Sequence, residues 1–141
     1  MNWMLMPYRR YAEFSGRSQR KEYWMFVLFQ IIVAMVPYLF IIAGAPRFDQ
    51  ATGQPGGSPG ALFYLAVLFL LGFGLVTIIP GLAVQVRRLH DTDRSGWWWW
   101  IQFVPLVGSI ILLVFMCLDG TPGPNRFGPD PKDRTDASVF S

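Results

Sequence analysis

The chain has 141 residues, of which 52% are hydrophobic and 15% are charged, and its formal net charge is +3. This balance argues against a soluble globular protein, and the length suits one domain. The apolar residues gather in three uncharged blocks, residues 23–45, 61–86 and 97–118. Each block is longer than the roughly 18 residues that mark a membrane-spanning helix.

The sequence therefore predicts an all-α integral membrane bundle of three transmembrane helices, forming one membrane domain over residues 1–131. Residues 1–22 mix aromatic side chains with five cations, which is typical of an interfacial segment. Ser18 is the expected N-cap of the first helix. Glu22 then falls in the first turn, where the helix dipole favours a carboxylate.

Glycine and proline mark the connections. Residues 44–60 are rich in both and predict an irregular loop, whereas residues 87–96 predict a short connection. The chain after residue 118 is a Gly/Pro-rich C-terminal tail, which is expected to be ordered only where other residues hold it. Its last part, 132–141, is expected to be variable.

The cations beside the blocks indicate an orientation, because Lys and Arg are retained on the cytoplasmic side of a membrane. Five precede the first block, one lies in the first connection, three lie in the second and three lie in the tail. This distribution places the N-terminus in the cytoplasm.

The third block allows two topologies. Three full spans, with Pro105 as a kink, are preferred, because non-helical backbone inside a bilayer must be sheltered by protein. The alternative is a re-entrant hairpin that turns at residues 105–108 and returns the tail to the cytoplasm.

Candidate binding residues lie where the predicted spans meet the membrane surface. Arginine forks onto lipid phosphates, and tryptophan suits the headgroup zone. The pattern therefore predicts a site for anionic lipid headgroups or for a membrane-protein partner. Its residues are Arg17, Arg20, Arg87, Arg88, His90, Asp91, Arg94, Trp97 and Trp98. The simpler interpretation is a topological anchor and a turn held by ion pairs.

Polar residues inside the blocks are few. Gln30, Thr77 and Gln102 are predicted intramembrane polar contacts, and the two amides are expected to face the bundle interior, where each can bond to the other or to backbone. We predict no catalytic, cofactor or metal site. His90, Asp91 and Ser95 lie too close in sequence to form a catalytic triad, and the chain has one histidine.

Three patterns occur in order along the chain: FSGRSQRKEYW at 14–24, RRLHD at 87–91 leading to GWW at 96–98, and GPNRFGPDP at 123–131. Together they resemble the YhaH-type bacterial inner-membrane family, domain of unknown function 805, from about residue 3 to residue 131. The resemblance implies a multi-pass protein of the bacterial inner membrane with no established substrate. It also implies that residues 125–131 dock on the domain, with Phe127 as a candidate plug.

The expected function is a lipid- or partner-binding membrane scaffold and not an enzyme. Its expected partners are membrane lipids, above all anionic ones, and a membrane protein or further copies of the chain, with no nucleic acid. The alternative is a subunit of a small oligomeric transporter or channel. That alternative needs oligomers, because three helices with so few polar groups do not enclose a pore.

Overall fold

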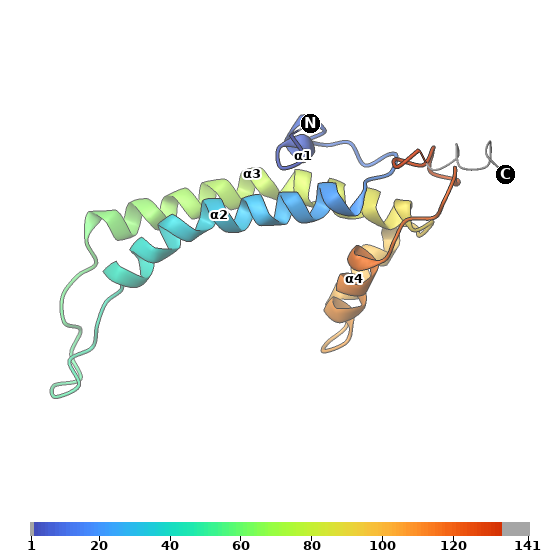
Figure 1. The fold of residues 1–141 in the computed structure, drawn as a ribbon. Helices are drawn as coiled ribbons and strands as arrows, with labels where there is room; N and C mark the ends of the chain where they lie inside the picture. The colour runs from blue at the N-terminus through green and yellow to red at the C-terminus, as the bar shows by residue number, and fades with distance from the viewer. Residues whose placement is uncertain (1, 134–141) are drawn as a thin grey trace. The chain divides into compact units, whose positions relative to one another are not determined.

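The computed structural model describes residues 2–133, and five helices form within them (Figure 1). They are α1 (Met6–Arg9), α2 (Arg20–Gly44), α3 (Ala61–Asp91), the 3-10 helix η1 (Gly96–Phe103) and α4 (Gly108–Cys117). The all-α prediction is confirmed over these residues. Most of the variable tail predicted at 132–141 lies outside them.

Two compact units make up the chain. One is Phe29–Thr77, which we call the hairpin unit. The other combines Met1–Leu28 with Ile78–Ser141 and is called the cap unit. Helices α2 and α3 each contribute residues to both units.

Helices α2 and α3 are long and apolar enough to cross a membrane. Their 25 and 31 residues correspond to about 37 and 46 Å, against a hydrocarbon core of about 30 Å. Large apolar side chains along both helices are exposed; Leu68, for example, is 67% exposed and Leu75 is 69% exposed. Water penalises such exposure, so hydrocarbon is the solvent that these helices suit.

In the hairpin unit, the two helices pack beside each other. A Cβ added to Gly44 would lie 3.0 Å from the Cβ of Phe63, so their backbones approach closely there. Both helices line an apolar groove of about 390 Å³. The connecting loop is irregular, as predicted, with one β-bridge between Phe48 and Pro55.

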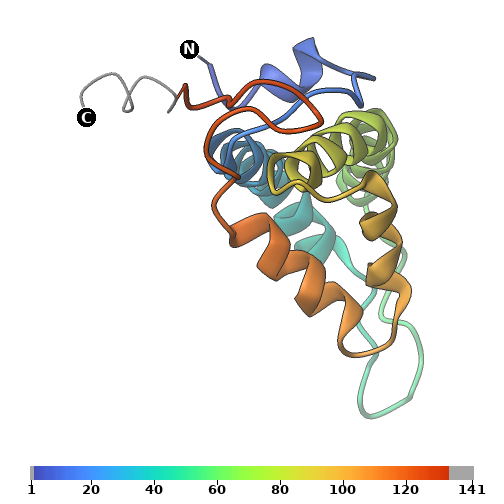
Figure 2. The same ribbon diagram turned by 90° about the vertical axis from the view of Figure 1, so that its right-hand side faces the viewer.

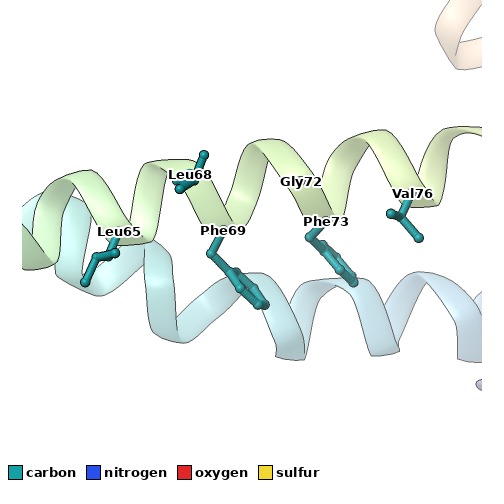
Figure 3. A pocket seen from close by; sticks show the side chains of 6 residues that line it. All are labelled: Leu65, Leu68, Phe69, Gly72, Phe73 and Val76. Atoms are coloured by element: carbon teal, nitrogen blue, oxygen red, sulfur yellow. The ribbon is translucent and has the colours of Figure 1, made fainter.

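A second groove of the hairpin unit lies along α3 alone. It measures about 440 Å³ and is lined by Leu65, Leu68, Phe69, Gly72, Phe73 and Val76. Figure 3 shows the rings of Phe69 and Phe73 projecting to the same side of the helix, and their planes are parallel at 6.1 Å between centroids. Its lining carries no polar side chain, so it suits acyl chains or another apolar surface.

The third apolar block does not form one helix. Helix η1 ends at Phe103, the chain reverses, and α4 returns from Gly108 (Figure 2). A Cβ at Gly108 would overlap the carbonyl of Ile101, so this approach requires glycine. The two helices measure about 16 and 15 Å, too short for a core of about 30 Å. The prediction of one continuous helix over 97–118 is therefore wrong, and a third span is not confirmed.

The short helices join an apolar core in the cap unit. Leu112 and Met116 of α4 are four residues apart and share one helix face, and with Leu89 of α3 they form the buried centre. Partly buried side chains pack around it: Tyr23, Trp99, Ile101 and Phe115. This core fixes η1 and α4 against the ends of the long helices.

Candidate functional site

Six buried charged side chains meet in the cap unit, and we call them the charged cluster. They are Arg17, Glu22, Arg87, Arg88, Asp91 and Asp130, and each is at most 8% exposed. Three cations balance three carboxylates. Buried charges are tolerated where they are paired and hydrogen-bonded, so their contacts decide what the cluster can do.

Arg87 of α3 is completely buried and holds the N-terminal segment. Its Nε donates to Ser18 Oγ at 2.9 Å, and its Nη2 donates to Glu22 Oε1 at 3.0 Å. Its Nη1 donates to the backbone carbonyls of Glu13 at 2.7 Å and Arg10 at 3.2 Å. The guanidinium is thus enclosed by protein acceptors.

Arg17 binds the tail, the chain after residue 118, in a similar way. Its Nε donates to Asp91 Oδ1 at 3.0 Å. Its Nη2 and Nη1 donate to the carbonyls of Thr121 at 2.6 Å and Gly123 at 2.7 Å, and Asp130 lies 4.0 Å away. One side chain near the N-terminus therefore binds both α3 and the tail.

Arg88 completes the cluster from the other side of Asp91. Its Nη1 donates to Asp91 Oδ2 at 2.7 Å, and its Nη2 donates to the carbonyl of Leu118. Gly120 lies against the Asp91 carboxylate so closely that an added Cβ would overlap all three carboxylate atoms. Within residues 2–133, Arg88 Nε is the buried side-chain nitrogen left without a hydrogen bond.

The tail docks on His90. The rings of His90 and Phe127 stack with 4.0 Å between centroids, and His90 Nδ1 lies 3.1 Å from the carbonyl oxygen of Gly16. Asn125 donates from Nδ2 to the carbonyl of His90 at 2.9 Å. The predicted docking of residues 125–131 is confirmed.

A pair outside the cluster braces the N-terminal segment. Arg10 donates to the Glu13 carboxylate from Nε at 2.7 Å and from Nη2 at 2.9 Å. This hydrogen bonding lowers the pKa of the Glu13 carboxyl below its ordinary value. Solvent reaches both side chains, so the pair contributes little to stability.

The structure buries four residues of the predicted headgroup site: Arg17, Arg87, Arg88 and Asp91. Protein groups bind their donors and acceptors, apart from Arg88 Nε. Residues 87–91 are also the last turns of α3 and not a connection. The simpler interpretation was an anchor and a turn held by ion pairs; the ion pairs are observed, but they hold the end of a helix and not a turn.

The other predicted binding residues are more accessible. The Arg20 side chain is 43% exposed, with Asp119 at 3.5 Å. The guanidinium of Arg94 lies 4.2 Å from the ring centroid of Phe115. Trp97 and Trp98 are exposed and line a shallow groove of about 250 Å³ with Ser95 and Ile101.

The predicted intramembrane contacts differ from those observed. Gln30 and Gln102 are half-buried, and neither amide forms a hydrogen bond to another of residues 2–133. Thr77 donates from its hydroxyl to the carbonyl of Phe73 at 2.6 Å, within its own helix. Gln85, near the end of α3, does bond to another element: its Oε1 accepts from Trp99 Nε1 at 2.6 Å.

Several residues of the site were not predicted. Ser18 is not the N-cap, because α2 begins at Arg20, and its hydroxyl instead accepts from Arg87. Glu22 does lie in the first turn, as predicted, but also pairs with Arg87. Gly120, Thr121 and Asp130 complete the contacts of Asp91 and Arg17. The signal for most of them lies in the three sequence patterns, which hold every residue of the charged cluster.

Arg17→Lys is expected to release the tail although it keeps the charge. A single ammonium cannot reach the carboxylate and both carbonyls that the guanidinium fork holds. Losing two charge-assisted hydrogen bonds, at about 1.5–3 kcal/mol each, predicts at least a roughly tenfold faster protease cleavage within residues 119–133. The matched control is Arg126→Lys, whose exposed pair with Asp93 should matter little. Equal cleavage rates in the two variants would contradict this role of Arg17.

Comparison with known proteins places the chain in a family. The model of a protein family of unknown function, DUF805, matches residues 11–129. The inner membrane protein YhaH of Escherichia coli K12 is 44% identical over 133 residues, covering 94% of this chain and 98% of the relative. The inner membrane protein YhaI of the same strain is 45% identical over 133 residues, covering 94% and 97%.

A more distant relative is the uncharacterised protein YiiR of Escherichia coli K12, 29% identical over 145 residues, covering 85% of this chain and 86% of the relative. No solved structure matches the chain. The matched residues of this chain contain α2, α3, η1, α4 and the whole charged cluster except Asp130. The chain is a membrane protein that belongs to the DUF805 family.

Proposed function

We propose that the protein is a non-enzymatic scaffold of the bacterial inner membrane that binds anionic lipid headgroups beside its cap unit. The N-terminus then lies in the cytoplasm, since the cap unit holds nearly all the cations of the chain. The names of the relatives YhaH and YhaI support the inner membrane as its location. The charged cluster serves as the internal framework of the cap unit.

The observation that carries the proposal is a set of three cations of the cap unit that have no carboxylate partner among residues 2–133. They are Arg9, Lys21 and Arg94. Lys21 Nζ lies 5.4 Å from the ring centroid of Trp3, and Arg94 lies over Phe115. A cation beside an aromatic ring suits the interface, where the ring is half in hydrocarbon and the charge meets lipid phosphate.

The test compares four single variants that each remove one unpaired cation. Arg9→Gln, Lys21→Gln and Arg94→Gln should each lower the preference for phosphatidylglycerol over phosphatidylcholine, measured by native mass spectrometry. About 1 kcal/mol for each surface cation corresponds to roughly a fivefold change. The control is Arg47→Gln in the loop between α2 and α3, which should leave the preference unchanged.

Two results would count against headgroup binding. One is a lipid preference that none of the three cap-unit variants changes. The other is an equal loss in Arg47→Gln, which would indicate a nonspecific effect of net charge.

The alternative, a subunit of an oligomeric transporter or channel, has less support. A conducting path needs polar groups across the membrane, and both grooves of the hairpin unit have apolar linings. The hydroxyl of Thr77 is used within its own helix. A ring-like oligomer in the same mass spectra, together with ion flux, would favour this alternative.

A further inference from the structure

We infer that η1 and α4 form a re-entrant hairpin that penetrates one membrane leaflet and returns to the side from which it entered. Its tip, around Leu106, lies among the acyl chains of that leaflet. The C-terminal segment is consequently on the same side of the membrane as the N-terminal segment. This inference goes beyond lipid headgroup binding and does not depend on it.

The two ends of the hairpin meet at the charged cluster. Thr121 donates from its backbone N–H to the carbonyl of Asp91 at 2.8 Å, and the carbonyl of Leu118 accepts from Arg88. The chain therefore leaves the charged cluster after Asp91 and has returned to it by residue 121. A cluster of six charges is too costly for the hydrocarbon core, so both ends must lie near the same membrane surface.

The residues between these ends suit acyl chains. Residues 95–118 carry no charge, and the large side chains nearest the reversal are open, with Leu106 90% and Phe103 65% exposed. Contiguous apolar exposure of this kind marks a surface that is covered in the working molecule. At about 16 Å, the hairpin reaches about half of a core of about 30 Å.

Within the reversal at residues 104–108, many backbone polar groups form hydrogen bonds with one another. Such bonds are required in hydrocarbon, where water is not available as a partner. Pro105 has no N–H group. The N–H groups of Val104, Val107 and Gly108 donate to the carbonyls of Ile101, Pro105 and Val104 at 3.0, 2.9 and 3.1 Å. Leu106 adopts a left-handed conformation with φ 68°, which is energetically unfavourable for leucine. The fold therefore holds this exposed side chain at the tip in a strained backbone conformation.

The sidedness test uses three isosteric cysteine variants in a Cys117→Ser background. Ser15→Cys probes the N-terminal segment, Ser58→Cys the loop between the spans, and Ser141→Cys the end of the chain. Cells are treated with a membrane-impermeant maleimide before and after permeabilisation. The inference predicts that Ser141→Cys behaves as Ser15→Cys does and opposite to Ser58→Cys. If Ser141→Cys behaves as Ser58→Cys does, the third block crosses fully and the inference is overturned.

A second measurement tests depth. Leu106→Cys carries an environment-sensitive fluorophore, and the labelled protein is reconstituted with lipids whose nitroxide lies either at the headgroup or deep in the acyl chain. Deep quenchers should act more strongly at Leu106→Cys, and headgroup quenchers more strongly at the Ser15→Cys control. Stronger headgroup quenching at Leu106→Cys would mean that the hairpin stays at the surface, which overturns penetration. Val107→Cys provides a second tip position if the first variant folds poorly.

These results are distinct from those of the lipid test. A protein that fails to select phosphatidylglycerol can still return its C-terminus to the N-terminal side. Conversely, a third full crossing leaves the cations at Arg9 and Lys21 free to bind lipid.

Discussion

Arg87→Ala is expected to lower the free energy of unfolding by about 3–5 kcal/mol, because it leaves a buried carboxylate without its principal partner. Glu22 is 2% exposed and retains only a long contact of 3.9 Å with Arg10. Ser18 and two backbone carbonyls lose their donor as well. The measurement is reversible denaturation in detergent or lipid.

The matched control for Arg87→Ala is Arg126→Ala. Arg126 lies 3.3 Å from Asp93, but both side chains are about half exposed or more, so the expected loss is about 0–1 kcal/mol. A double variant, Arg87→Ala with Glu22→Gln, should recover part of the loss because the uncompensated charge is gone. Similar small losses in both single variants would show that the charged cluster does not hold the cap unit together.

Gly120→Ala is expected to have the second large effect, lowering the free energy of unfolding by about 3 kcal/mol or more. The added methyl would overlap the carboxylate of Asp91, and that carboxylate cannot move aside because Arg17 and Arg88 hold both of its oxygens. Overpacking costs about 1–3 kcal/mol, and breaking a buried ion pair adds to it. The tail should be released, which is measured as faster proteolysis after Leu118 together with a lower denaturation midpoint.

Gly74→Ala is the control for Gly120→Ala. Gly74 lies within α3, and a Cβ there meets no atom within 4 Å, so the change should stay within about 1 kcal/mol and favour the helix. If Gly120→Ala is tolerated as well as Gly74→Ala, the tail does not dock tightly on Asp91.

The sequence was sufficient to predict the features that depend on composition and local pattern. Two uncharged blocks became α2 and α3, and the Gly/Pro-rich stretch between them became an irregular loop. The docking of the tail followed from the resemblance to the family, and Asn125 and Phe127 do contact α3. Long apolar runs and turn residues determine the two long helices and the loop almost independently of tertiary contacts.

The third block shows where hydropathy fails. A crossing helix and a half-inserted hairpin have the same apolar composition, so periodicity and charge do not separate them. What decides the fold is a close backbone approach at Gly108 and the return of residue 121 to Asp91. Pro105 marked the position of the break, but a proline in a membrane helix is equally compatible with a kink.

The candidate site was predicted in the right region, and of its two interpretations the ion pairs are observed. Arginines beside a span usually point to the headgroups, and nothing local indicates that Arg87 will meet Glu22, which lies 65 residues away in sequence. Pairing at such separation depends on the tertiary fold. Arg94, which is only half-buried, differs from the buried arginines in its contacts and not in residue type.

Hydrogen–deuterium exchange of the peptide covering residues 119–131, in the protein reconstituted in lipid, tests most directly whether the charged cluster joins the N-terminal segment, α3 and the tail. The backbone N–H of Thr121 donates to Asp91, and Asn125 and Gly128 bond to each other. Slow exchange that becomes fast in Arg17→Lys is the predicted result. Exchange at the rate of a free peptide in the unaltered protein would contradict the docked tail and with it the account of the cap unit.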